Sequence, residues 1–514
     1  MRHERDAHLS VADSLVMKAS CKPPSLAVAR NALCILAWLL LALLAPACVL
    51  APQSVVDSPT PEALASQLSP TDSPVRTAFP PGTIFEYLAQ PGDTLPALAA
   101  HFNTSEAAIR EANPDLPQVI TTLPAGYPIQ VPAYYLPLTS TPFHILPDSQ
   151  ALNGPAAVDF DLQVAVESRP GFLKGLTDYA QRRQRPAWQV IEVVARNYSI
   201  HPKLLLTLLE HQTHALTQPE AGGNRAIYPL GYENFRQRGL YRQLTWAAER
   251  FNNAYYGWRT GAVELELADG RLTKPDPWQN AGTVGVHGVF AALYGESEFE
   301  TAIGPQGLAR TWSELWGDPF ADELVVIPPS LQQPDLGLPF PPNRVWDFTG
   351  GPHPSWGDGL PYGALDFAPP AAIIGCAPSA EAFTAPAAGI VTTSDHAMVT
   401  LDLDGDGDER TGWVLFFYHV ATGGRAPQGL VVEQGDPLGY PSCEGGFATG
   451  THVHLARRFN GEWIPAGGPI PFEMGGWTAA YGAEPYQGTL TKGSKVVEAC
   501  TCSMAENRIE YTLP

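Results

Sequence analysis

The sequence is poor in charge, and poorest in basic residues. Only 16% of its 514 residues are charged, against about 25% in an average protein. Lys and Arg number 31 and Asp and Glu number 52, which gives a net charge of −21. A nucleic-acid-binding protein needs a basic face to meet phosphates, so we expect no nucleic acid among the partners. We also find no internal repeat.

Apolar and aromatic residues, in contrast, are plentiful. Hydrophobic residues make up 45% of the chain, and it holds 12 Trp, 18 Tyr and 20 Phe, which excludes general disorder. Gly (47) and Pro (51) are also abundant, which favours rigid loops, linkers and β-structure over long surface helices. The length predicts roughly three domains.

An uncharged apolar segment near the N-terminus predicts export. It spans residues 32–52, and Lys18, Lys22 and Arg30 precede it, as in a signal sequence. The small residues before Cys48 fit ordinary signal cleavage or a lipobox in which Cys48 is lipidated. The segment is also just long enough to remain as a membrane anchor. Each alternative makes the rest of the chain extracytoplasmic, and two of them make the membrane a partner.

Cysteine is scarce beyond the leader. Cys376, Cys443, Cys500 and Cys502 are the four that remain, an even number that suggests disulfides in an exported domain. Free buried thiols are the alternative. Cys376–Cys443 is the preferred pair. Cys500 and Cys502 are only two positions apart, which would strain a mutual bridge, so their state stays open.

Residues 83–133 form a first compact segment, after a Pro/Ser-rich linker at 53–82. Two short strands are predicted at 85–89 and 127–131. Two helices lie between them, the first capped by Asp93 or Thr94 and the second by Thr104 or Ser105. Asn113-Pro114 ends the second helix.

The GDTL turn, the two helices, the Asn-Pro and the IQVP ending resemble a LysM domain. The resemblance implies a βααβ fold that binds N-acetylglucosamine-containing glycans, usually peptidoglycan. The groove would lie between two loops; its expected residues are Gly92, Asp93, Thr94, Leu95, Asn113 and Pro114.

The C-terminal third, residues 344–490, has short alternating apolar runs that predict β-structure. His452 and His454 are two positions apart on an expected strand, so their side chains point into one site. His419 follows the strand 413–418 and is expected on the face of Leu415 and Phe417.

These segments, with FTAPAAGIVTTS and VVEQGDPLG, resemble the lysostaphin/LytM-type zinc endopeptidases, whose fold is antiparallel and β-rich and carries the duplicated hybrid motif. Most members have their first zinc His four residues before the Asp, where Tyr362 stands here. The β-lytic and staphylolysin-like subgroup has it 13 residues before, which is His353. The resemblance therefore implies one zinc ion per chain on His353, Asp366 and His454, with His419 and His452 catalytic. Such a site leaves one tetrahedral position open for water.

The acidic run DLDGDGDERTGW at 402–413 resembles the start of a calcium loop at 402–408. Its twelfth position holds Trp413 where a calcium loop has Glu. An acidic hairpin between two strands is therefore the preferred interpretation, with calcium as the alternative.

Residues 157–335 carry helical patterns. The run 190–218 resembles the start of a lysozyme-like lytic transglycosylase, but the best register places Gln212, not Glu210, at that family's catalytic Glu. An amide cannot donate a proton as a carboxylic acid does, which favours a degenerate glycan-positioning domain.

The sequence thus predicts a multidomain α+β protein: a leader (1–52), a linker, a LysM module, a helical middle domain, a peptidase domain and a tail (491–514). The leading hypothesis is an exported, peptidoglycan-bound zinc endopeptidase that hydrolyses cell-wall peptide cross-links. The alternatives are a catalytically silent wall-binding regulator or scaffold, and a glycan-cleaving enzyme that uses Glu210.

Overall fold

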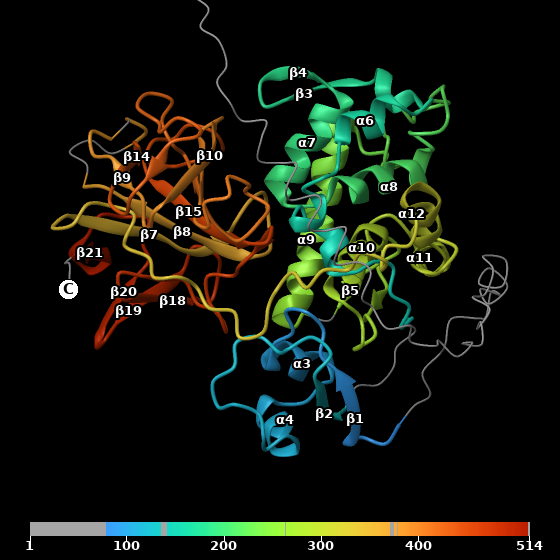
Figure 1. The fold of residues 1–514 in the computed structure, drawn as a ribbon, viewed down its shortest axis with the longest axis horizontal. Helices are drawn as coiled ribbons and strands as arrows, with labels where there is room; N and C mark the ends of the chain where they lie inside the picture. Colours follow the sequence, from blue (N-terminus) through green and yellow to red (C-terminus); the bar gives the residue numbers. More distant parts are fainter. Residues whose placement is uncertain (1–78, 135–140, 263, 371–374, 378, 512–514) are drawn as a thin grey trace, which may run out of the picture. The chain divides into compact units, whose positions relative to one another are not determined.

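The computed structural model describes residues 79–511 except 135–140, 263, 371–374 and 378 (Figure 1). The predictions for the leader, including Cys48, and for most of the linker lie outside these residues. The described residues belong to one compact unit, residues 70–514. Within them, no helix is both long enough and apolar enough to cross a membrane.

The N-terminal module has the predicted βααβ order. Its elements are β1 (Thr83–Leu88), α3 (Leu95–His101), α4 (Glu106–Ala112) and β2 (Pro128–Ala133). The two strands pair antiparallel along their whole length. Thr94 and Ser105 cap the two helices through their hydroxyl oxygens, which decides between the capping residues that the sequence left open.

The middle of the chain is helical. Its helices are α5 (Asp148–Ala151), α6 (Leu162–Glu167), α7 (Ala187–Tyr198), α8 (Pro202–Thr213), α9 (Leu240–Thr260), α10 (Ala281–Ala291), α11 (Glu296–Ile303) and α12 (Leu308–Trp316). Two small hairpins accompany them, β3 (Thr177–Ala180) with β4 (Arg183–Pro186) and β5 (Leu265–Glu266) with β6 (Leu272–Thr273). Single 3₁₀ turns lie at 155–157, 172–175 and 235–237.

Helix α10 is the centre of this region, and all of its residues are buried. Such a helix is apolar on every side because it has no solvent face. A Cβ atom at Gly285 would lie 2.4 Å from the Phe251 ring of α9, so glycine there lets the two helices pack closely. The helical core also takes in residues 145–152, which precede the predicted start of the helical domain at residue 157.

The C-terminal domain is built on a nine-stranded antiparallel sheet with the order β13-β10-β11-β12-β15-β8-β7-β21, and β16 pairs with β15. Its strands are β7 (Val345–Pro354), β8 (Tyr362–Ala368), β10 (Gly389–Asp395), β11 (Met398–Asp402), β12 (Trp413–Tyr418), β13 (Val431–Val432), β15 (Val453–Phe459), β16 (Glu462–Trp463) and β21 (Arg508–Glu510).

Two smaller sheets complete this domain. One pairs β9 (Phe383–Thr384) with β14 (Pro437–Gly439), and the other is the meander β17 (Glu473–Met474), β18 (Trp477–Tyr481), β19 (Gly488–Lys492) and β20 (Lys495–Glu498). A 3₁₀ turn at Ala505–Asn507 leads into β21, which pairs with β7. The segment 491–510, expected as a tail, therefore contributes strands to the domain.

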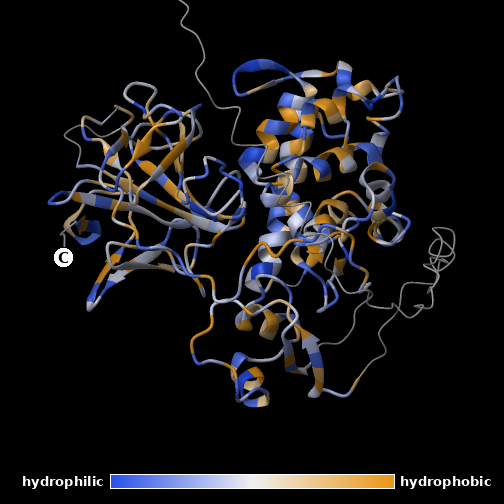
Figure 2. Cartoon of the chain, viewed as in Figure 1, coloured by the Kyte–Doolittle hydropathy of each residue, from blue (hydrophilic) through white to orange (hydrophobic). Residues whose placement is uncertain are grey.

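Both faces of the main sheet are buried. Leu365, Phe417 and Leu455 belong to the core of the C-terminal domain itself. On the other face, Phe416 and Ala456 share a core with the helical region. Strand β12, WVLFFY, is apolar along its whole length, as a strand covered on both faces is expected to be. In Figure 2 the strands of this domain carry orange stretches between white and blue ones. The multidomain α+β fold that the sequence predicts is confirmed.

Two disulfides join the four cysteines beyond the leader. Cys376 and Cys443 form the expected pair. Cys500 and Cys502, whose state the sequence left open, are bonded to each other.

Candidate metal centre

Three side chains from neighbouring strands meet at one end of the main sheet. Asp366 on β8 and His454 on β15 lie directly opposite each other in the antiparallel register. His353 lies near the end of β7, opposite Ala364, after register shifts that displace it along β8. All three are buried, and their potential ligand atoms lie within 4.8 Å of one another. Strand pairing thus brings together the three residues that the sequence singled out.

The spacing of the donor atoms fits a tetrahedral metal. His353 Nε2 lies 3.0 Å from His454 Nδ1 and 3.3 Å from Asp366 Oδ1, and His454 Nδ1 lies 3.5 Å from that oxygen. Zinc bonds of 2.0–2.1 Å at tetrahedral angles place neighbouring donors about 3.3 Å apart. The three donors therefore have the mutual distances that one zinc ion requires.

Hydrogen bonds to the backbone settle which ring nitrogens face the site. His353 Nδ1 donates to Gly351 O (2.8 Å), and His454 Nε2 donates to Ser355 O (3.1 Å). A carbonyl only accepts, so these nitrogens carry the hydrogens of the neutral rings and His353 Nε2 and His454 Nδ1 carry lone pairs. Asp366 Oδ1, to which both point, is buried and has no hydrogen-bond partner. Three acceptors that converge in this way fit a bound cation.

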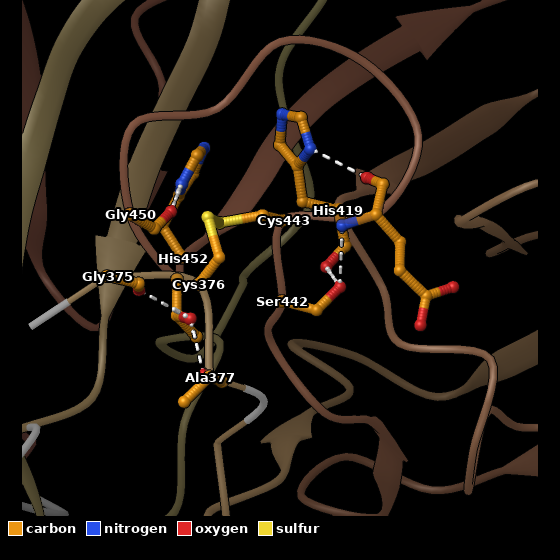
Figure 3. The surroundings of a disulfide bond; sticks show 10 residues. Gly375, Cys376, Ala377, His419, Ser442, Cys443, Gly450 and His452 are labelled. Carbon is orange, nitrogen blue, oxygen red and sulfur yellow. Dashed lines mark hydrogen bonds between the residues drawn. A yellow bond between two sulfur atoms is a disulfide. The ribbon is translucent and has the colours of Figure 1, made fainter. Parts of the chain in front are cut away.

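His452 and His419 lie beside this group. His452 Nε2 is 3.7 Å from Asp366 Oδ1, and the His419 and His452 rings are 4.6 Å apart. His452 Nδ1 donates to Gly450 O (2.7 Å), and His419 Nδ1 donates to Glu444 O (2.9 Å) (Figure 3). The Nε2 atom of each ring is therefore left as a proton acceptor. Cys376–Cys443 anchors the loops that carry these carbonyls.

One prediction about His419 is wrong. The alternation of β12 placed it on the face of Leu415 and Phe417, which is the core face. The strand ends at Tyr418, and His419 has a φ of 60°, which turns its side chain to the opposite face, where His454 lies. A left-handed residue breaks the two-residue period on which the prediction depended.

Burial and neighbouring charges shift the pKa values of three residues in the site. Burial and the neighbouring His452 and His454 lower the pKa of His419 to about 3, and burial also lowers the pKa of His454. Burial alone would raise the pKa of Asp366, but the imidazoles of His353 and His452 hold it well below its usual value. At neutral pH Asp366 is therefore a carboxylate and His454 a neutral imidazole, the protonation states that bind metal.

Tyr486, which no sequence pattern indicated, stacks on His353 with ring centroids 4.2 Å apart. It lies in the loop between β18 and β19, and its backbone N–H donates to Pro352 O. Its position more than thirty residues beyond His454 carries no local signal. Tyr486 covers one face of the His353 ring and so restrains its orientation.

The expected glycan residues of the LysM module separate into two groups. The carboxylate of Asp93 is buried and accepts hydrogen bonds from Tyr87 OH (2.7 Å) and Gln90 N (2.7 Å). The Asn113 amide bonds Ile109 O and the backbone of Gln130. These two side chains therefore hold the loops, whereas Gly92, Thr94 and Leu95 line a cavity and Pro114 is exposed.

Glu210 has a structural role in the helical region. One carboxylate oxygen accepts from Leu216 N (2.7 Å), and the other accepts from the Thr217 hydroxyl. Gln212 Oε1 accepts from Tyr294 OH (2.9 Å), on another side of the helix. Glu210 thus fixes the turn that follows α8.

The acidic run joins β11 to β12, as the hairpin interpretation predicts. Asp402, Asp404 and Asp406 have carboxylates close enough together to hold a cation. Asp402 accepts from the backbone N–H groups of Asp404 and Gly407, which organise the turn.

The fold and the site define the class. A His-Asp-His metal site on an antiparallel sheet, with two more histidines beside it, is that of an M23 zinc metallopeptidase of the LasA/lysostaphin type. In this chain the peptidase domain follows a LysM domain and a LasA N-terminal domain.

Comparisons with known proteins name the particular relatives. Residues 87–132 match the LysM domain model, and residues 144–329 match the model described as LasA, N-terminal domain. Protease LasA of Pseudomonas aeruginosa (strain UCBPP-PA14) is 26% identical over 377 residues, which cover 69% of this chain and 81% of the relative. The helical region, whose first helices resemble a lysozyme-like domain in sequence, is thus a LasA N-terminal domain.

Two solved structures are also similar. The M23 metalloprotease pseudoalterin from the deep sea is 21% identical, with 32% of this chain and 96% of that chain covered and a TM-score of 0.28. The catalytic domain of lysostaphin from Staphylococcus simulans is 20% identical, with 24% and 90% covered and a TM-score of 0.18.

Proposed function

We propose that this protein is an exported zinc endopeptidase that hydrolyses the peptide cross-links of bacterial peptidoglycan. The observation that carries the proposal is the convergence on Asp366 Oδ1, which lies 3.3, 3.5 and 3.7 Å from nitrogens of His353, His454 and His452. A buried, unbonded carboxylate oxygen amid imidazole lone pairs is costly unless a cation binds there.

In this proposal His353 Nε2, Asp366 Oδ1 and His454 Nδ1 hold one zinc ion. When bound, zinc supplies Lewis-acid polarisation of the scissile carbonyl. His452 Nε2 is placed to take the proton of the attacking water, because Gly450 O holds its Nδ1 hydrogen. His419, whose pKa is lowered to about 3, is neutral and assists with the developing oxyanion or with the proton.

In this proposal the other parts of the chain bring the peptidase domain to its substrate outside the cytoplasm. The LysM domain implies peptidoglycan binding, which raises the concentration of the peptidase at its substrate. The apolar segment before residue 53 supports export, by cleavage, lipidation of Cys48 or anchoring, and the two disulfides suit an oxidising, extracytoplasmic compartment.

Wall digestion by the purified full chain tests the proposal. Intact peptidoglycan is incubated with the wild-type chain, with His454→Ala and with Glu210→Gln, and bound zinc, new amino groups and new reducing ends are measured. New amino groups report peptide cleavage, and reducing ends report cleavage of sugar chains. We expect zinc and amino-group release in the wild type, loss of both in His454→Ala, and retention of both in folded Glu210→Gln.

The outcomes separate the alternatives. A chain with neither zinc nor amino-group release contradicts the endopeptidase and favours a silent wall-binding regulator or scaffold. Reducing ends that disappear only in Glu210→Gln would favour the glycan-cleaving enzyme.

A further inference from the structure

A cavity of about 410 Å³ lies at the junction of the LysM domain, helix α9 and the C-terminal domain. Its volume is within the range of small-molecule binding sites. The residues that matter here are Thr94 and Leu95 from the LysM domain, Arg259 from α9, and Pro469, Ile470 and Tyr481 from the C-terminal domain.

The LysM side of the cavity is held in place by α9. Arg259 donates to Pro91 O, and a Cβ atom at Gly92 would lie 2.6 Å from the Arg259 guanidinium. Gly92 also has a φ of 81°, so both the backbone and the close contact require glycine. The turn in which the sequence places sugar binding therefore forms one rigid wall of the cavity.

The opposite wall belongs to the peptidase domain. Tyr481 is 44% exposed, and its ring lies against Gly467, where a Cβ atom would approach it to 2.6 Å. Pro469 and Ile470 continue this wall as an apolar surface. A half-exposed aromatic ring beside apolar groups suits the C–H face of a sugar ring and the methyl group of an acetamide.

Polar groups line the remaining side. Arg259 Nε lies 2.9 Å from Glu462 Oε1, and Arg259 also pairs with Asp148 at 2.8 Å. Because the one guanidinium is paired with two carboxylates, no free positive charge remains on this side to bind an anionic ligand. The cavity offers hydrogen bonds along one side and apolar contact along the other, which matches a neutral N-acetylated sugar.

We propose that this cavity is a glycan site shared between the LysM domain and the peptidase domain, and that it takes an N-acetylhexosamine oligosaccharide. This inference rests on the proposed wall-binding function and extends it, because the sugar chain contacts the Pro465–Ile470 segment and Tyr481 as well as the LysM loop. The glycan then joins the two domains, so that the peptidase meets wall that the LysM domain already holds.

Binding of N-acetylchitotetraose to the full chain tests the shared site. We expect Thr94→Ala and Tyr481→Ala each to weaken binding about tenfold, whereas Tyr481→Phe, which keeps the ring, binds like the wild type. Tyr179→Ala is the matched control, because Tyr179 is 60% exposed on β3, away from the cavity lining. Unchanged circular dichroism confirms that each variant is folded.

Hydrogen exchange supplies a second readout that does not depend on the variants. The tetrasaccharide should slow exchange both at residues 92–97 and at residues 464–470. Slowing at 92–97 alone, with normal binding by Tyr481→Ala, overturns the shared site and leaves LysM binding intact. No binding by the wild-type chain overturns the shared site and the proposed glycan anchoring together.

Discussion

His353 Nε2 and His454 Nδ1 lie 3.0 Å apart, and a backbone carbonyl binds the other nitrogen of each ring. Both facing nitrogens therefore carry lone pairs in the neutral rings, and Asp366 Oδ1 adds a third acceptor. Their repulsion is relieved by a shared cation or by protons. The fold thus holds three acceptor atoms in positions that a bound metal stabilises.

Zinc should stabilise the chain without being needed to fold it. The strands that carry the ligands are fixed by a separate apolar core that includes Leu365 and Leu455. Chelation should therefore lower the melting midpoint while the circular dichroism at low temperature stays unchanged. Zinc in thousandfold excess over its Kd should add about 4 kcal/mol to the free energy of unfolding.

Zinc content distinguishes the ligands from other carboxylates. Asp366→Ala should lose the metal, whereas Asp404→Ala, in the acidic turn, should keep one zinc per chain in elemental analysis. Retention of zinc by Asp366→Ala would contradict the assigned site.

His452 and His419 should matter for turnover and not for metal binding. Removing a positioned proton-transfer group costs about 10²- to 10⁴-fold in rate. His452→Ala and His419→Ala should therefore lose amino-group release from peptidoglycan by such factors and keep their zinc. His211→Ala, in the helical domain, is the control, and loss of zinc from both site variants would assign them to the metal instead.

Arg259 should be among the most sensitive positions for stability. Its guanidinium is 8% exposed and pairs with the buried carboxylates of Asp148 and Glu462. Arg259→Met leaves two buried charges unpaired, which should cost about 3–5 kcal/mol, measured by denaturant unfolding. Adding Glu462→Gln should recover part of that loss. Arg271→Met, which breaks exposed pairs, should change little, and equal midpoints for the two Met variants would refute this role.

Asp93 should make the LysM domain less stable as the pH rises. Burial raises its pKa from 3.8 to about 6, so the folded state binds the proton more tightly than the unfolded state does. The cost of ionising it is absent below pH 4 and complete above pH 6, where two pKa units correspond to about 3 kcal/mol.

Asp93→Asn keeps a carbonyl oxygen that can accept from Tyr87 and Gln90. The variant should slow hydrogen exchange in β1 and β2 at pH 7. It should also reduce the loss of LysM-domain stability between pH 4 and pH 6. A variant with the same pH dependence as the wild type would show that Asp93 is not its source.

Local patterns sufficed for much of this fold. The caps, turns and short apolar periods of residues 83–133 specify the LysM module, because each element forms from neighbouring residues. The two-residue period of a strand places His452 and His454 together, and the structure places Leu455 on the other, core face. The helical region was recognised as helical, but its periodicity shows only which faces are buried and not which family they belong to.

By itself, then, the sequence determined the three-domain order, the β-rich C-terminal domain and the five residues of the candidate metal centre. Tertiary structure decided what depends on residues far apart in the chain. Register shifts between β7 and β8 bring His353 to Asp366, a left-handed backbone at His419 turns it to the site, and Tyr486 reaches His353 from another sheet. The cavity beside Arg259 likewise exists only where three domains meet, since no local pattern records a contact between distant segments.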